Sequence, residues 1–290
     1  MTPTVAVLGA INVDLVVRAP ELPRPGTTTT DGVFSRHQGG KGGNQAVAAA
    51  RALGGHGQVA MLGCVGQDDL GREAVDALRV EGIDVEGVAR ASDAPTGVAL
   101  IVVDDAGENQ IVVAPGANLR LELPHVLAEL ERTAPGLVLV SLEASPEATF
   151  GAATWCASRG VPMLLNPAPP RPWAREFLGA ATYLTPNTHE LEALGALPDG
   201  LVIVETRGAE GAAIRAPGIE ELRVQAPAVE SVDTTGAGDC LSGVLAASLA
   251  EGMDLPTAVR RAVDAAALSV TVRGAREGMP TREQIQEALG

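Results

Sequence analysis

Short, unbroken apolar runs alternate along the chain with longer stretches in which apolar residues recur at helical spacing. The runs cover residues 5–8, 59–62, 137–140, 163–165, 183–184 and 201–204, and their continuity is typical of strands buried on both faces of a sheet. Helices are predicted between them, for example at residues 70–81, 146–159 and 190–194. This alternation predicts an α/β fold with a doubly wound, mainly parallel sheet flanked by helices.

Two segments, residues 15–37 and 96–117, interrupt this rhythm with alternating, β-branched patterns and no helix between them. Residues 98–103 and 110–113 flank a turn at 104–107 and predict a hairpin. We therefore expect a small inserted β-sheet lid at 15–37 and 96–117, on a core of residues 1–14, 38–95 and 118–290. A small isolated sheet with an apolar face needs a cover, which a second copy of the chain would supply.

Composition narrows the range of partners. The formal net charge of −15 argues against a nucleic-acid or anionic-membrane partner, and aromatic residues are too scarce for base-stacking platforms. The three cysteines lie far apart without a CxxC motif, which favours buried thiols in a reducing cytoplasm. No apolar run approaches the roughly 20 residues of a membrane helix, and the chain enters a strand directly after residue 4 without a signal peptide, so a cytoplasmic location is expected.

The most informative motif is Asp233-Thr234-Thr235-Gly236-Ala237-Gly238-Asp239, followed directly by the helix-like stretch 240–249. Its glycines allow a tight turn in which several N–H groups point one way at the positive end of a helix dipole. Such a turn holds an anion such as phosphate. The carboxylate of Asp239 beside it could take a proton from an attacking hydroxyl, so the motif predicts phosphoryl transfer to an alcohol.

A second glycine-rich run, Gly39-Gly40-Lys41-Gly42-Gly43-Asn44-Gln45, opens the Ala-rich helical stretch 46–53. It is not a Walker A loop, because Gly42 stands where Ser or Thr must follow the lysine. The dinucleotide fingerprint fails as well, since Leu241 replaces its third glycine, and a dehydrogenase is therefore improbable.

Together the two runs resemble the paired signatures of the ribokinase (PfkB-type) family of carbohydrate kinases. Further landmarks of that family follow in its order over nearly the whole chain, at residues 9–14, 96–98, 116–118, 166–169 and 185–190. The resemblance implies a ribokinase-like fold, a lid that covers the sugar and also forms the contact of a homodimer, and ATP-dependent phosphorylation of D-ribose at O5.

The resemblance also implies roles for individual residues. Asp239 is the expected general base, beside an anion hole of Gly236, Ala237 and Gly238. Expected sugar-binding residues, to which Asp239 also belongs, are Asn12, Asp14, Gly40, Lys41, Asn44 and Glu143. Expected nucleotide-binding residues are Asn187, Thr206, Gly208, Gly211 and Gly238.

Two cations are implied in the same way. Asn187 and Glu190 would hold Mg2+ through water, although Glu190 could equally form a capping box. A K+ site is expected at Asp233, Thr235, Ser269, Val272, Gly274 and Gly278, with Gly278 standing where the family can place a serine. Asp233 could instead only cap the glycine loop.

Several alternatives stay open from the sequence. Another sugar kinase of the family, such as a deoxyribokinase or a nucleoside kinase, shares these motifs, and an inactive sugar-binding sensor would need no base. Only about ten residues separate Glu190 from the strand at 201, where the family usually has a further helix. We expect this departure to affect nucleotide affinity more than the phosphoryl-transfer step.

Overall fold

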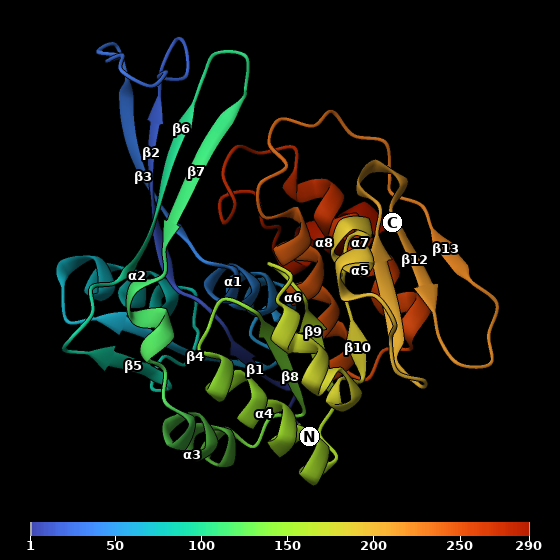
Figure 1. The fold of residues 1–290 in the computed structure, drawn as a ribbon. Helices are drawn as coiled ribbons and strands as arrows, with labels where there is room; N and C mark the ends of the chain where they lie inside the picture. Colours follow the sequence, from blue (N-terminus) through green and yellow to red (C-terminus); the bar gives the residue numbers. More distant parts are fainter. Residues whose placement is uncertain (1, 290) are drawn as a thin grey trace.

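The computed structural model describes residues 2–289 as a three-layered α/β core from which a smaller sheet rises (Figure 1). The core sheet has nine strands in the order β13-β12-β11-β10-β9-β8-β1-β4-β5. All neighbouring strands in it are parallel except β11–β12 and β12–β13. Its strands are β1 (Thr4–Leu8), β4 (Gln58–Gly66), β5 (Val88–Ala91), β8 (Leu137–Ser141), β9 (Met163–Asn166), β10 (Tyr183–Leu184), β11 (Val202–Thr206), β12 (Ala212–Arg215) and β13 (Leu222–Val224).

Each buried strand divides its side chains between two hydrophobic layers. In β1, Val5 and Val7 pack in one layer and Ala6 and Leu8 in the other, because successive side chains of a strand point to opposite faces. The first layer is covered by α1 (Lys41–Leu53), α2 (Asp69–Val80), α6 (Ala237–Ala250), α7 (Leu255–Ser269) and α8 (Arg282–Leu289). The second is covered by α3 (Leu123–Thr133), α4 (Pro146–Arg159), α5 (Thr188–Leu194) and the 3-10 helices η1 (Gly116–Arg120) and η2 (Pro172–Ala180).

The predicted doubly wound, mainly parallel sheet is therefore confirmed. The helices predicted at 70–81, 146–159 and 190–194 begin within two residues of α2, α4 and α5. The helical stretches expected from residues 46 and 240 begin earlier, at Lys41 in α1 and at Ala237 in α6. The strand expected at 201–204 lies at Val202–Thr206. The short segment after Glu190 still makes a parallel crossover, since α5 joins β10 to its parallel neighbour β11.

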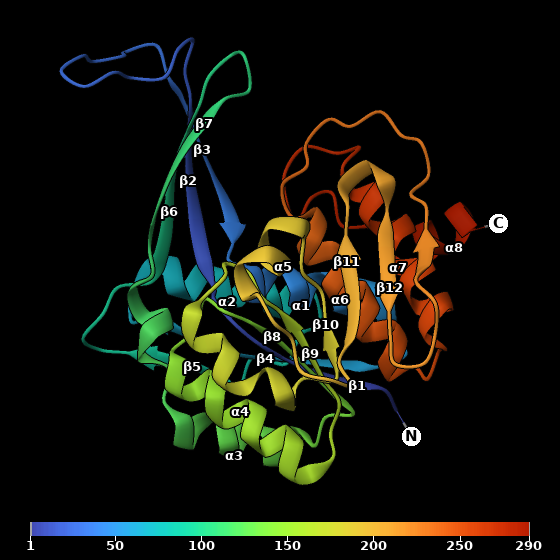
Figure 2. The ribbon, with the colours of Figure 1, turned by 45° about the vertical axis from the view of Figure 1, so that its right-hand side comes forward.

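The chain changes direction across the sheet at β1, which has β4 on one side and β8 on the other. The crossover helix α1 covers the first layer and α4 the second, so the loops after β1 and β8 diverge and leave a crevice between them. The segments after β1, β8, β9, β10 and β11 all reach this edge of the sheet, below the smaller sheet (Figure 2).

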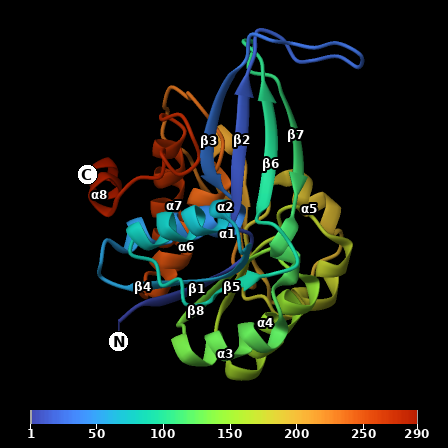
Figure 3. The same cartoon turned by 90° about the vertical axis from the view of Figure 1, so that its left-hand side faces the viewer.

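The smaller sheet, which we call the lid, has four strands in the order β3-β2-β6-β7 (Figure 3). They are β2 (Asn12–Arg18), β3 (Val33–Gly39), β6 (Gly97–Val103) and β7 (Asn109–Ala114). The pair β2–β6 is parallel, and β6–β7 forms the predicted hairpin. Strand β2 begins at Asn12 and not at Leu15, so Asn12 and Asp14 lie on the lid and not in the core segment 1–14.

The closest helix packing in the core joins the two helices that follow the glycine-rich runs. Gly243 of α6 faces α1, where an added Cβ would lie 2.7 Å from the Ala48 Cβ and still closer to the Gln45 carbonyl oxygen. The glycine thus lets the backbones of α1 and α6 approach each other, and their N-terminal ends share one cavity.

We expect Gly243→Ala to lower the free energy of unfolding by about 1–3 kcal/mol, because the extra methyl group overpacks this contact. Urea denaturation would measure the change. Gly179→Ala is the matched control, since a Cβ there would meet no heavy atom within 4 Å. Equal midpoints for the two variants would contradict the tight packing of α1 on α6.

Candidate active site

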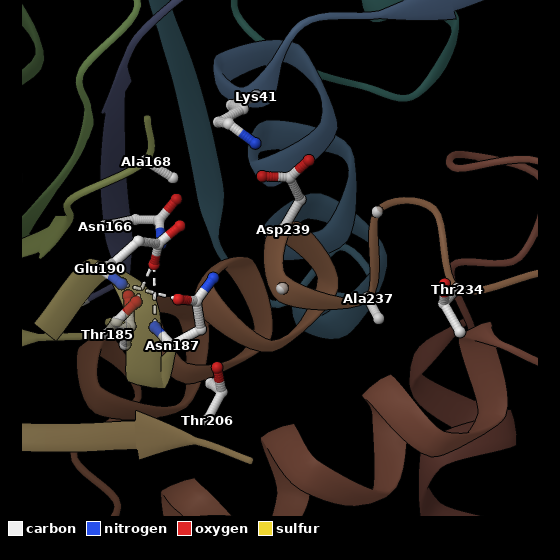
Figure 4. Close-up of a pocket in the computed structure, with 12 residues that line it drawn as sticks. Lys41, Asn166, Ala168, Thr185, Asn187, Glu190, Thr206, Thr234, Ala237 and Asp239 are labelled. Carbon is white, nitrogen blue, oxygen red and sulfur yellow. Dashed lines mark hydrogen bonds between the residues drawn. The ribbon is translucent and has the colours of Figure 1, made fainter. Parts of the chain in front are cut away.

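Asp239 lies in the first turn of α6, where the N-terminal ends of α1 and α6 meet beside the core sheet. It lines a cavity of about 210 Å3 together with Lys41, Asn166, Thr185, Asn187 and Glu190, and with Thr234 and residues 236–238. Figure 4 shows the Lys41 amine and the Asp239 carboxylate pointing toward each other across it. The carboxylate of Asp239 raises the pKa of Lys41 above its usual value, so the lysine is a cation at neutral pH.

Two amides hold the carboxylate of Asp239. Asn44 Nδ2 donates to Oδ2 over 3.1 Å, and Gln45 Nε2 donates to Oδ1 over 3.0 Å. Asp239 is only 7% exposed, and because an ionised carboxylate is an acceptor only, two donors suit its charged form. Each oxygen keeps a further lone pair for a substrate hydroxyl.

The N-terminus of α6 has the features expected of an anion hole. Its N-cap, Gly236, has φ +78°, and no side chain caps the helix. Ala237 N–H donates to Thr234 O over 3.3 Å, and the next N–H groups, those of Gly238 and Asp239, are free to meet a ligand. A Cβ on Gly236 would lie 2.9 Å from the Ala275 Cβ. The open N–H groups, the helix dipole and Lys41 together attract negative charge to this end of the cavity.

The expected sugar residues come from β2, from the start of α1, from the segment after β8 and, for Asp239, from α6. Lys41 N–H donates to the Glu143 carboxylate over 3.1 Å, and Asn12 Oδ1 accepts from Asn118 Nδ2 over 2.8 Å. Gly40, with φ +83°, brings the start of α1 against the segment after β1, where a Cβ would lie 2.6 Å from Ala10 O. Asn12 and Glu143 also line a cavity of about 520 Å3 beneath the lid.

Two half-buried acids among the expected sugar residues, Asp14 and Glu143, have basic side chains near them. Burial raises the pKa of Asp14, and the charges of Arg276 and His37 oppose that rise. Burial likewise raises the pKa of Glu143, with Lys41 acting against it. Neighbouring cations thus partly balance the negative charge of both carboxyls.

A third cavity, of about 590 Å3, adjoins the first and shares Thr206, Thr234, Ala237 and Gly238 with it. It lies between the β11–β12 hairpin and helices α6 and α7, and its other lining residues include Gly208, Gly211, Val229, Leu241 and Val263. The segment 206–211 is the turn of the antiparallel β11–β12 hairpin, and it forms one edge of this cavity.

Asn187 and Glu190 form a capping box at the start of α5. Asn187 Oδ1 accepts from Glu190 N–H and Glu190 Oε2 accepts from Asn187 N–H, both over 2.8 Å. This is the alternative role that the sequence left open for Glu190. Both side chains still line the first cavity, with the second carboxylate oxygen of Glu190 uncommitted. Within residues 2–289, no three His, Cys, Asp or Glu side chains cluster as a metal site.

The residues expected around K+ lie in two adjoining loops. Asp233 accepts from Thr235 N–H over 2.9 Å and from Gly274 N–H over 3.0 Å. Burial alone would raise the pKa of Asp233, but these hydrogen bonds outweigh it and hold the pKa below its usual value. Gly278 packs on the carbonyls of Ser269 and Gly274, and its added Cβ would collide with Ser269 O, so a serine does not fit there. Val272 belongs to the same loop and is exposed.

Three contacts of this site escaped the sequence analysis. Gln45 and Asn166 appeared in it only as parts of motifs, yet Gln45 Nε2 bridges Asp239 and Asn166. Arg276 was not identified at all, although its guanidinium donates to Asn44 Oδ1 over 3.0 Å. Asn44 and Arg276 lie 232 residues apart, and no local pattern marks a single loop arginine as a neighbour of the base.

Comparison with known proteins agrees with this geometry. The family model described as pfkB family carbohydrate kinase matches residues 2–282. The ribokinase of Bacillus subtilis (strain 168) is 40% identical over 296 residues, which cover 98% of this chain and 99% of that protein. Two solved structures are similar to this one, each with a TM-score of 0.89 over 100% of this chain and 99% of the other chain. They are the ribokinase of Thermotoga maritima, at 31% identity, and Arabidopsis thaliana ribokinase complexed with ribose and ATP, at 28% identity. The chain therefore belongs to the pfkB family of carbohydrate kinases.

Proposed function

We propose that this chain transfers the γ-phosphoryl group of ATP to O5 of D-ribose. The observation that carries the proposal is the position of the Asp239 carboxylate, between the uncapped N-terminus of α6 and the expected sugar residues Lys41 and Asn44 of α1. A base within reach of both a hydroxyl and a phosphate cradle suits transfer to an alcohol. The similarity to ribokinases, one of them complexed with ribose and ATP, supports ribose as the acceptor.

The reaction would use the two ends of the cavity together. Asp239 accepts the proton of the O5 hydroxyl while O5 bonds to the γ-phosphorus, and the bond from that phosphorus to the β–γ bridging oxygen breaks as ADP leaves. The N–H groups at residues 236–239 and the Lys41 ammonium stabilise the charge on the transferring group. The cavity between the β11–β12 hairpin and α7 would take the nucleoside of ATP.

The sugar would bind through fixed donors and acceptors. Asp14 and Glu143 accept from hydroxyls, and Asn12 and Asn44 can contribute amide groups. A site built in this way rejects a sugar that lacks one of the matched hydroxyls, since a buried polar group is then left unpaired.

The donor set also suits a magnesium ion bound with the nucleotide. The uncommitted carboxylate oxygen of Glu190 and the Asn187 side chain face the cavity beside the anion hole, and Mg2+ in such sites keeps several waters and shares the phosphates. When bound, the ion would screen the phosphate oxygens.

Turnover across candidate acceptors tests this function. We expect ADP release from MgATP to depend on D-ribose, with lower kcat/KM for 2-deoxyribose, adenosine and fructose. Preference for another acceptor would keep the phosphoryl-transfer chemistry and change the substrate. Saturable ribose binding without any turnover would leave only a sugar-binding protein.

We also propose that K+ binds beside the anion hole, held by Asp233 and by carbonyls of the loops at residues 269–278. The low pKa of Asp233 keeps the carboxylate ionised at neutral pH, as a cation ligand must be. We expect turnover to be several-fold faster in KCl than in NaCl, and Asp233→Ala to abolish the difference between the two salts. If Asp233→Ala were less active but kept the wild-type ratio of turnover in KCl to turnover in NaCl, the proposed K+ site would be contradicted. Asp233 would then only cap the glycine loop.

We further propose a homodimer formed through the lid. Phe34, Leu100 and Val112 are 62%, 53% and 68% exposed, and Leu100 pairs with Val112 across β6–β7 on one face of the sheet. We expect light scattering to give a dimer mass for the wild type and a monomer mass for Val112→Asp. Val80→Asp on α2, where Val80 is 87% exposed, is the control and should stay dimeric. A monomeric wild type would contradict the proposed interface.

Within residues 2–289 no helix combines the length and the apolar character that a bilayer span requires. Cys64, Cys156 and Cys240 are free and buried, which suits a reducing compartment such as the cytoplasm.

A further inference from the structure

We infer that Arg276 is a positioning residue for the base, acting through the amide of Asn44. Its guanidinium is buried and does not contact the Asp239 carboxylate. It donates from Nε to Asn44 Oδ1 over 3.0 Å and from Nη2 to Gly39 O over 2.8 Å. The inference rests on the proposed function of Asp239 as the base.

The chemistry of arginine determines which way the Asn44 amide points. A guanidinium has donors and no acceptor, so only the amide oxygen of Asn44 can face it. The Asn44 NH2 group must then point the other way, where it donates to Asp239 Oδ2. Without Arg276 the amide could turn over and present its oxygen to the carboxylate, which would repel it.

The other oxygen of Asp239 is held from the opposite end of the same network. Asn166 Nδ2 donates to Thr185 O over 2.9 Å, which leaves Asn166 Oδ1 to accept from Gln45 Nε2. That nitrogen also donates to Asp239 Oδ1. Arg276 can only donate hydrogen bonds, and the Thr185 carbonyl can only accept them. These two ends of the network therefore determine the orientation of the side-chain amides of Asn44, Gln45 and Asn166 between them.

The backbone of Arg276 is itself fixed. Arg51 Nη1 donates to Arg276 O over 2.7 Å and to Met279 O over 2.8 Å, while Arg51 Nη2 and Glu81 form an ion pair at 2.6 Å. The guanidinium thus rests on a braced loop, and burial lowers its pKa only to about 10, which leaves it charged at neutral pH. A group so constrained can determine the orientation of its hydrogen-bond partner.

A double-mutant cycle tests this role. We expect Arg276→Met to lower kcat about 10- to 100-fold while KM for ATP stays near the wild-type value, because the base is misplaced and the nucleotide cavity is untouched. In an Asn44→Ala background the same substitution should change kcat by less than about threefold, since the amide through which it acts is gone. Arg276→Gln, which keeps a donor amide, should retain more activity than Arg276→Met.

The matched control is Arg261→Met. Arg261 is a second buried arginine, paired with Glu251 and bonded to Ala52 O, and it is remote from the three cavities. We expect this variant to lose stability in a thermal melt and to keep its kcat. Should Arg276→Met not fold, Arg276→Gln replaces it in the cycle.

The inference would be overturned if the effects of the Arg276 and Asn44 substitutions on kcat multiplied in the double variant. A folded Arg276→Met variant with wild-type kcat would also overturn it. The cycle is run with whichever acceptor the wild type uses best. A wild type that ignores ribose would then count against the proposed substrate alone, whereas multiplying effects would count against the role of Arg276 alone.

Discussion

Asp239→Asn is expected to lower kcat by about 100- to 10,000-fold, the range found when a general base is lost from a preorganised site. The amide has nearly the shape of the carboxylate but cannot take the O5 proton. It would also place an NH2 group against the amide donor of Asn44 or of Gln45, since each oxygen of Asp239 now accepts one of these bonds. Single-turnover kinetics with saturating ribose and MgATP would measure the loss.

A matched control separates chemistry from folding. Asp264 is a second buried aspartate; it lies on α7 and pairs with Arg260 at 3.2 Å, so Asp264→Asn should keep its kcat. Calorimetric titration of Asp239→Asn with MgATP should give an affinity close to that of the wild type. Full activity in this variant would remove Asp239 from the mechanism and leave it as a substrate ligand.

Asp14→Ala is expected to raise KM for ribose by about 100-fold or more with little change in KM for ATP, because the matched hydroxyl loses its acceptor in a buried site. The substitution also removes a negative charge near the buried guanidinium of Arg276, which leaves that cation less well compensated. Initial rates across ribose concentrations would show the change.

Asp105→Ala is the control for Asp14→Ala. Asp105 belongs to the same lid but is exposed in the turn between β6 and β7, so its removal should leave both KM values unchanged. If Asp14→Ala raised KM for ATP as much as KM for ribose, the role of Asp14 would be structural support of the lid and not recognition of the sugar.

The parts of this molecule that the sequence predicts well are those with a local signal. The apolar runs at 5–8 and 137–140 predict buried parallel strands, because only strands covered on both faces lack polar alternation. The glycine-rich motif at residues 233–239 predicts a tight turn before a helix, and Gly236 does have the positive φ that such a turn requires.

The parts that it misses depend on contacts between distant segments. Asn12 and Asp14 were expected in the core segment 1–14, yet the parallel pairing of β2 with β6 extends the lid to Asn12, and this pairing cannot be inferred from either segment alone. The capping box of Asn187 and Glu190 has a local pattern, but that pattern is equally typical of a metal site. Arg276 has no pattern at all.

The hydrogen bond from Asn44 to Asp239 spans 195 residues of sequence, and that from Arg276 to Asn44 spans 232. Contacts of such long range form late, after the entropy of closing large loops has been overcome. During synthesis most core strands and five helices can leave the ribosome before either partner of Asn44 exists. An unfinished or C-terminally trimmed chain that ends before residue 276 would therefore have most of the fold and an unbraced base, so sugar phosphorylation would reach its full rate only when translation is nearly complete.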